Sequence, residues 1–150
     1  MKKAIIFCYS VHHGNTRKLA EAIKERCGVD LVILPCKELP DLPDYELVGF
    51  ASGIYMSAFG RSIIELVDKL QGIDKKDCFT MYTSGAASDK FDLAFVQKLE
   101  SKGAHVVGRF NCRGFDTFGP FKLIGGLRKG HPNTKDIKAA VAFFESLVIE

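Results

Sequence analysis

The chain contains no tryptophan, and its five cysteines are spread widely along the sequence. Zinc and iron–sulfur sites need closely spaced cysteine ligands, so neither kind of site is predicted. An odd number of scattered cysteines is typical of a reducing compartment, and we therefore expect a cytoplasmic protein. No apolar stretch approaches the length that crosses a bilayer, so no membrane span is expected.

A strong excess of charge is also missing. The formal net charge is +3 at pH 7, and the basic residues are dispersed. A nucleic-acid-binding domain concentrates basic residues in a patch, so no nucleic-acid partner is predicted. The 150 residues, of which 47% are hydrophobic, suit a single domain over 1–150 that folds without disulfides or a structural metal. The apolar run near the N-terminus is too short for a signal peptide and predicts a first strand.

Apolar runs and amphipathic stretches alternate along the chain. The runs predict five strands, at residues 3–9, 30–34, 47–51, 78–82 and 105–111. The amphipathic stretches predict helices at residues 16–27, 61–70, 91–102 and 133–148. Asn133, with Asp136 three residues later, is a good cap for the last helix.

This alternation predicts an α/β fold with right-handed crossovers and a three-layer, doubly wound architecture. Five strands in a chain of this length favour a parallel sheet of order 2-1-3-4-5. Ligands of such sheets bind beyond the carboxyl ends of the strands, where the winding reverses between the first strand and the third. The loops predicted to carry function are therefore residues 10–15, 52–59 and 83–90.

The first of these loops joins a buried strand to a helix, whose first amides and positive dipole end attract an anion. Gly14 allows close approach of the backbone, and neutral donors surround it. The candidate phosphate-binding residues are Ser10, His12, His13, Gly14, Asn15 and Thr16. Neither the Walker pattern nor the dinucleotide-binding pattern G-x-G-x-x-G is present. A capped helix start with no ligand is the alternative.

The same loop resembles that of flavodoxins, in which an aromatic-ended strand leads into a hydroxyl-rich loop that closes in Gly-x-Thr. The matching residues are Tyr9, Gly14, Asn15, Thr16 and Ala20. Val11 and His13 depart from the hydroxyl residues usual in that family. The resemblance implies a flavodoxin-like fold, flavin mononucleotide (FMN) as cofactor, and electron transfer with a redox partner protein or a small-molecule acceptor.

The other two loops would hold the flavin ring. An isoalloxazine needs an apolar or aromatic face and a few backbone donors. The second loop offers Ser52, Gly53, Ile54, Tyr55 and Met56, although a left-handed backbone at Met56 would be costly. The third loop offers small residues with accessible amides: Thr83, Ser84, Gly85 and Ala86.

The stretch from Cys112 to Pro132 shows no clear strand or helix and is rich in glycine and phenylalanine. Such long loops are usually functional or disordered. Two hypotheses stand: this stretch covers the site as a lid, or its aromatic residues pack against the edge of the sheet. Cys112 is interpreted as a buried structural cysteine, with a redox role as the alternative.

Two functions share the predicted site. An FMN electron carrier is favoured, and an FMN-dependent oxidoreductase acting on a quinone or porphyrinogen is the alternative. The oxidoreductase is supported by a looser similarity of residues 55–59 to flavodoxin-like, menaquinone-dependent protoporphyrinogen oxidases and by the absence of the acidic balance usual in flavodoxins. A flavin-free structural domain is a third hypothesis. A receiver domain and a low-molecular-weight tyrosine phosphatase lack their required residues here.

Overall fold

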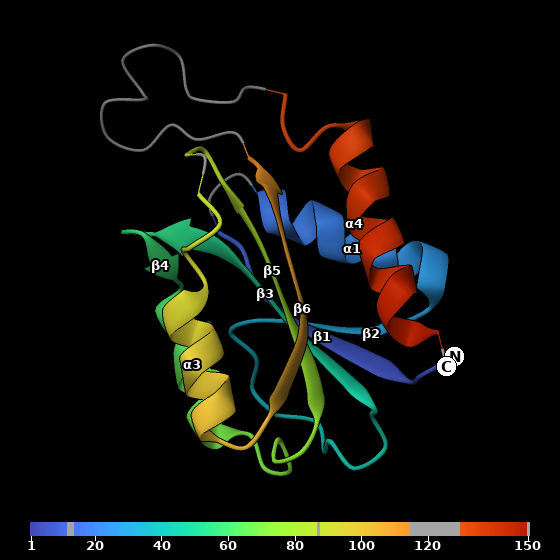
Figure 1. Cartoon of the computed structure of the whole chain (residues 1–150), viewed down its shortest axis with the longest axis vertical. Coiled ribbons are helices and arrows are strands. Elements are labelled where there is room, and N and C mark those ends of the chain that lie inside the picture. Colours follow the sequence, from blue (N-terminus) through green and yellow to red (C-terminus); the bar gives the residue numbers. More distant parts are fainter. Residues whose placement is uncertain (12–13, 87, 115–129, 150) are drawn as a thin grey trace.

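The computed structural model describes residues 1–11, 14–86, 88–114 and 130–149. Its centre is a parallel sheet of order β2-β1-β3-β5-β6, and a short strand β4 pairs antiparallel with β3 at the side (Figure 1). The strands are β1 (Ala4–Tyr9), β2 (Asp30–Ile33), β3 (Leu47–Tyr55), β4 (Ala58–Phe59), β5 (Asp77–Ser84) and β6 (His105–Arg113). Without β4, this is the predicted order 2-1-3-4-5, so the predicted fold class is confirmed.

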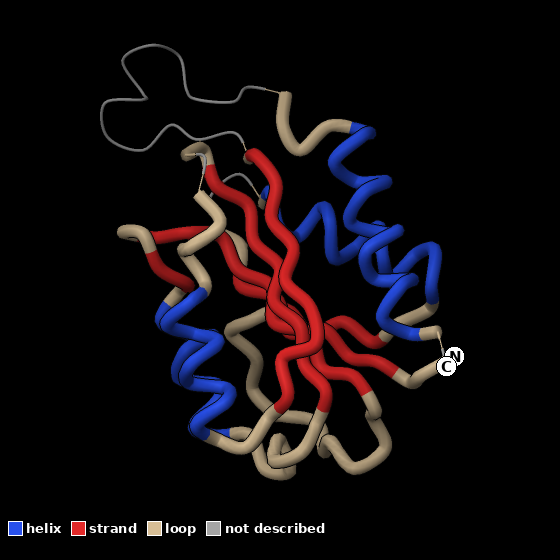
Figure 2. The backbone as a smooth tube through the Cα atoms, in the orientation of Figure 1, coloured by secondary structure: helices blue, strands red, loops and turns tan. Residues whose placement is uncertain are grey.

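Helices cover both faces of the sheet (Figure 2). The helices are α1 (Asn15–Cys27), α2 (Arg61–Lys69), α3 (Leu93–Ser101) and α4 (Thr134–Val148). Helices α1 and α4 pack on one face through residues such as Leu19 and Phe144. Helices α2 and α3 pack on the other through residues such as Ile63 and Phe95. The apolar residues of the central strands are thus buried on both sides, as their continuous apolar runs indicate.

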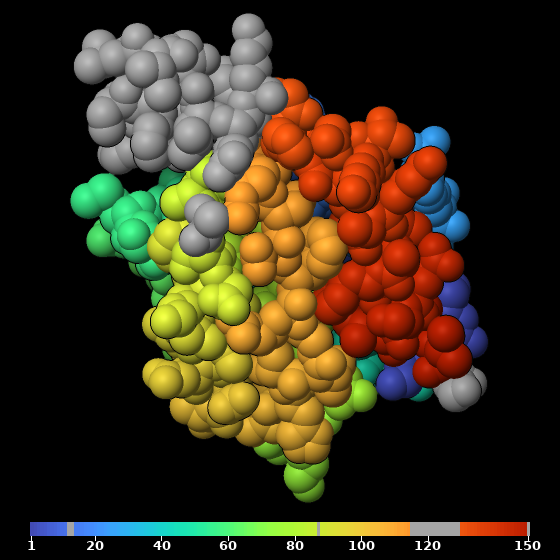
Figure 3. Space-filling view, turned by 45° about the horizontal axis from the view of Figure 1, so that its top comes forward, coloured from blue at the N-terminus to red at the C-terminus, as the bar shows by residue number. Residues whose placement is uncertain are grey.

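The sheet is not covered equally throughout. The two core clusters take alternate residues of β1, with Ile5 and Phe7 on one face and Ile6 and Cys8 on the other. The edge strand β6 instead alternates exposed and half-buried residues from His105 to Phe110 and is half-buried from there to Arg113. Figure 3 shows β6 at the surface between α3 and α4. The central strands therefore anchor the core, while β6 presents side chains to solvent.

Several predicted boundaries need correction, most of all in the second loop. Residues 52–59 form a β-hairpin, since β3 continues to Tyr55 and pairs Tyr55 with Ala58. The two turn residues, Met56 and Ser57, have φ of 54° and 63°. Positive φ at both positions is typical of the type I′ turn, which fits the twist of the flanking strands, so the turn imposes a left-handed backbone even on Met56.

The remaining differences are smaller. Strand β5 includes Thr83 and Ser84, which were predicted in the loop, and α1 begins at Asn15. Strand β6 includes Cys112 and Arg113, which were predicted to belong to the stretch without a clear strand or helix. Residues 115–129 of that stretch are outside the described part of the chain, and the lid and packing hypotheses remain predictions. None of the described helices is long and apolar enough to cross a membrane.

Candidate functional site

Three segments distant in sequence meet at the carboxyl ends of the central strands. Thr16 of α1 and Thr83 of β5 place their Oγ1 atoms 2.8 Å apart in a buried hydrogen bond. Gly114, just after β6, lies against them: a Cβ there would stand 2.8 Å from Nδ2 of Asn15 and 3.0 Å from Cβ of Thr83. The close approach of Gly114 to these side chains therefore requires glycine.

The Thr16–Thr83 pair has a chemical consequence. Thr16 is 0% exposed and Thr83 is 4% exposed, so both hydroxyls have left bulk water. Each hydroxyl has one proton, and the bond between the pair uses only one of the two. The accepting hydroxyl keeps its own proton. The pair can therefore donate one further hydrogen bond to an acceptor beside the start of α1.

The start of α1 is the second element of the site. Gly14 precedes the helix with φ of 63°, and its position supplies no side-chain cap. Among the described residues, a Cβ at Gly14 would meet nothing within 4 Å, so space lies open there. The amides of a first helical turn have no partner within the helix and favour an anion. Ser10 is half-buried at the end of β1, whereas His12 and His13 lie outside the described residues.

The β3–β4 hairpin forms the next wall. Ser52 is fully buried; its Oγ donates to the Gly53 carbonyl and accepts from the Gly60 amide, at 2.6 and 3.0 Å. These bonds tie the end of β3 to the start of α2. Ser52 therefore fixes the backbone of this wall, and its hydroxyl uses its one proton in doing so.

Tyr55 crosses from this hairpin to the loop after β1. Its hydroxyl accepts a hydrogen bond from the Val11 amide at 3.1 Å. Its ring meets that of Tyr9 edge to face, with centroids 5.6 Å apart. Ile54, beside it, is half-buried, and Met56 at the tip is 84% exposed. The hairpin thus brings the predicted aromatic residue beside the predicted phosphate loop.

The turn after β5 forms the opposite wall. The Ser84 hydroxyl donates to the Ala86 carbonyl at 2.7 Å, closing a tight turn around the buried Gly85. Below it, Tyr82 is 1% exposed and donates to the Ser88 carbonyl at 2.6 Å. Figure 1 shows the β5 turn and the β3–β4 hairpin at the same end of the sheet. The residues predicted from three separate loops, where described, therefore lie at the same end of the sheet (Figure 1).

Sequence reasoning missed three contributors to this region. Gly60 lies under the Tyr9 ring, which a Cβ at Gly60 would overlap. Gly114 was included only in a long stretch without a specific role. The buried Asp92 forms an ion pair with the partly exposed Arg109 beneath the β5 turn, and the hydrogen bond to Asp92 raises the pKa of Arg109. A glycine before a helix is a weak sequence pattern, and the partnership of Asp92 with Arg109 depends on the sheet register.

Cys8 and Cys112 are unsuited to act as nucleophiles at neutral pH. Each of the five cysteines carries a free thiol. Burial raises the pKa of Cys112 to about 12, and it does the same for Cys8. A reactive cysteine needs a lowered pKa and an exposed thiolate. This supports the structural interpretation of Cys112.

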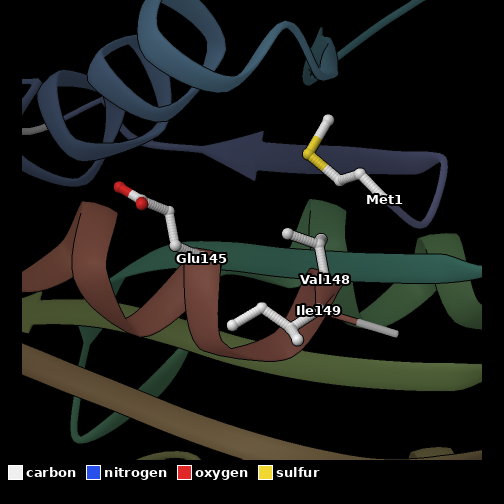
Figure 4. Close-up of a pocket in the computed structure, with 4 residues that line it drawn as sticks. All are labelled: Met1, Glu145, Val148 and Ile149. Atoms are coloured by element: carbon white, nitrogen blue, oxygen red, sulfur yellow. The ribbon is translucent and has the colours of Figure 1, made fainter.

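A pocket of about 300 Å³ lies at the opposite end of the sheet, far from this region. Met1 faces the last turn of α4 there, with Glu145, Val148 and Ile149 (Figure 4). The lining is mostly aliphatic, and Glu145 is its one charged side chain. The pocket therefore lacks the convergent polar groups that characterise the carboxyl end of the sheet.

Comparisons with known proteins agree with this fold. The Flavodoxin domain family model matches residues 6–114. An uncharacterized protein of Methanocaldococcus jannaschii is 41% identical over 149 residues, which cover 97% of this chain and 98% of that protein.

Two solved structures share the fold. A flavodoxin from the domain Archaea has a TM-score of 0.62 and 18% identity, covering 96% of this chain and 98% of its own. A flavoprotein in complex with FMN from Lactobacillus acidophilus has a TM-score of 0.62 and 18% identity, covering 74% of this chain and 93% of its own. By the family model, which spans most of the chain, this protein belongs to the Flavodoxin domain family.

Proposed function

We propose that this protein binds FMN at the carboxyl end of its sheet and transfers electrons through it. The observation that carries the proposal is the convergence of an uncapped helix start at Gly14 with the buried Thr16–Thr83 hydroxyl pair. This convergence lies beside the point between β1 and β3 where the winding of the sheet reverses. Family membership and the FMN complex of a structural neighbour support it.

The described residues fit the two parts of FMN. A phosphate is an anion, and Asn15, Thr16 and Thr83 are neutral residues beside a positive helix end. A flavin ring is flat and largely apolar, and Ile54 and Tyr55 offer an apolar face, opposite the turn of residues 84–86 with its small side chains. FMN, when bound, supplies the electron-accepting chemistry; the protein supplies binding, orientation and partial exclusion of water.

The site favours a mononucleotide. Its anion-binding elements suit one terminal phosphate, and the sequence has no dinucleotide-binding pattern. Titration of the flavin-free protein with FMN, FAD and riboflavin, followed by flavin fluorescence, tests this. We expect FMN to bind most tightly. FAD binding as tight as FMN binding would contradict the mononucleotide site, and no binding of any flavin would reject the proposed function.

Exposed apolar side chains at the rim favour a carrier that docks a redox partner protein. Met56 is 84% exposed and Val11 is 62% exposed, on segments that Tyr55 joins. Such side chains suit a transient protein interface around the ring. We expect Met56→Glu to slow electron transfer to a protein acceptor by about tenfold while leaving transfer to a small quinone unchanged. Equal slowing of both reactions would instead favour the oxidoreductase.

A further inference from the structure

Asp92 occupies an unusual position for an aspartate at a helix start. It precedes α3 as the N-cap residue, yet its side chain makes no capping hydrogen bond. It is 0% exposed. Its Oδ2 accepts from Thr80 Oγ1 at 2.6 Å and from Arg109 Nε at 2.9 Å, and its Oδ1 accepts from Arg109 Nη2 at 2.6 Å. The carboxylate that would ordinarily cap the helix is bound to the sheet instead.

Stability alone does not explain this arrangement. Burying a carboxylate is costly, and a buried ion pair often stabilises a fold no better than apolar residues of similar volume. The Arg109 side chain is 38% exposed, on the edge strand β6 where Thr80 is its register neighbour. The guanidinium reaches inward from β6 to Asp92, at the start of α3.

Arg109 and Tyr82 together hold the backbone above them. Nη2 of Arg109 also donates to the Asp89 carbonyl, and the Tyr82 hydroxyl donates to the adjacent Ser88 carbonyl. Two consecutive carbonyls are thus turned down toward the sheet by side chains of β5 and β6. Both belong to the turn after β5, here named the β5 loop (residues 85–86 and 88–92), whose first residues were predicted to contact the flavin.

We propose that Arg109 is a positioning residue for flavin binding, which acts by fixing the backbone of the β5 loop through Asp92 and the Asp89 carbonyl. This inference rests on the proposed function. The planar guanidinium serves both carboxylate oxygens and the carbonyl at once, which a single lysine ammonium cannot reproduce. Among the described residues, the polar side-chain contacts of Arg109 are with Asp92 and the Asp89 carbonyl, so its effect would reach the ring-binding side through the loop.

The test uses Arg109→Lys, which keeps the positive charge beside Asp92 but removes the planar guanidinium that binds both Asp92 oxygens and the Asp89 carbonyl. Hydrogen exchange of the β5 loop is measured in the flavin-free protein, and affinities are measured for FMN and riboflavin. We expect loop exchange to accelerate by about tenfold and both affinities to fall by a similar factor. The two flavins should weaken equally because the loop is predicted to contact the ring and not the phosphate.

The control is Lys98→Met, which breaks the exposed ion pair between Lys98 of α3 and Asp68 of α2, away from the β5 loop. It should leave loop exchange and both affinities unchanged. Unchanged loop exchange in Arg109→Lys, or a loss confined to FMN, would overturn the positioning role. A wild-type protein that binds no flavin would reject the proposed function, while the exchange measurement would still decide whether Arg109 orders the loop.

A second variant covers the case in which Arg109→Lys does not fold. The double variant Asp92→Leu, Arg109→Met removes both charges, so no unpaired charge stays buried and the fold should survive. We expect it to unfold at a urea concentration near that of the wild type but to show the same fast loop exchange and weak flavin binding. Wild-type exchange and affinity in this variant would overturn the proposal.

Discussion

The two ends of the sheet use polar side chains differently. At the amino end, Lys76 donates to the Tyr45 carbonyl, and the Tyr45 hydroxyl donates to Asp30 at 2.5 Å; these groups are exposed or only partly buried. At the carboxyl end, Ser52 and Thr16 are both 0% exposed. Burying a hydroxyl is costly unless it is hydrogen-bonded, so buried polar groups need a reason. Polar side chains at the amino end therefore stay in contact with solvent, whereas those at the carboxyl end are buried and hydrogen-bonded.

The largest expected effect is a difference in stability between alanine substitutions at two glycines of β3. A Cβ at Gly49 would overlap the Phe79 ring in the core, whereas one at Gly53 would meet mainly the Tyr55 hydroxyl at 2.8 Å, the far end of a movable side chain. We expect Gly49→Ala to lower the free energy of unfolding by about 3 kcal/mol, the upper end for an overpacked core. Urea denaturation measures this.

Gly53→Ala is the matched control, because it adds the same methyl group nearer the carboxyl end. It should cost well under half as much stability, since Tyr55 can move away from Val11. Flavin binding should nevertheless weaken, because Tyr55 and the backbone near Gly53 belong to the predicted ring site. Equal destabilisation by the two substitutions would show that the carboxyl half of β3 is packed as rigidly as the core.

The next effect concerns the hydroxyl pair. Thr16→Val keeps the shape of the side chain but removes the hydroxyl that lies at the start of α1, so an acceptor beside the helix start loses that donor. We expect FMN binding to weaken by about 2 kcal/mol, the value of a hydrogen bond to a charged group. Riboflavin, which lacks the phosphate, should bind almost as before. Isothermal titration of both ligands measures the difference, and Thr16→Ser should restore most of the FMN affinity.

A parallel loss for riboflavin would mean that Thr16 acts by holding the end of β5 through Thr83. The free energy of unfolding of the flavin-free variant distinguishes the two cases, since losing the Thr16–Thr83 bond itself should cost about 1 kcal/mol. A larger loss of stability, with equal weakening of both flavins, would contradict a phosphate-binding role for Thr16.

The sequence predicted the features that depend on local periodicity. Continuous apolar runs predicted the central strands, and Asn133 with Asp136 forms the expected capping box before α4. The sheet order followed from the alternation of strands and helices. The hairpin at Met56 was missed because its turn contains neither Asn nor Gly, the usual residues of such turns, so only pairing of Tyr55 with Ala58 shows it.

The site was predictable only in part for a similar reason. Thr16 and Gly14 lie in one short loop, where the pattern is local. The bond from Thr16 to Thr83, and that from Asp92 to Arg109, join residues from different strands or helices. Their meeting depends on strand register and on the exact start of α3, which the sequence places two residues too early. Long-range polar pairs of this kind leave no periodic pattern in a single sequence.

The smallest effect compares two thiols near opposite ends of the sheet. Burial raises the pKa of Cys78, at the amino end of β5, to about 12, and burial raises that of Cys112, at the carboxyl end of β6, equally far from the ordinary 9.0. Because the folded pKa exceeds the unfolded one, each thiol stabilises the fold fully below pH 9 and progressively less as the pH rises toward 12. We expect each to account for about 1 kcal/mol of lost stability between pH 9 and pH 10. Urea denaturation of the flavin-free wild type, Cys78→Ala and Cys112→Ala at the two pH values isolates each contribution, because all other groups titrate alike in the three proteins. Cys78→Ala could reduce the loss of unfolding free energy between pH 9 and pH 10 while Cys112→Ala leaves it unchanged. That result would mean that water reaches the carboxyl end of β6. The polar end of the sheet would then be more open than its buried hydroxyls indicate.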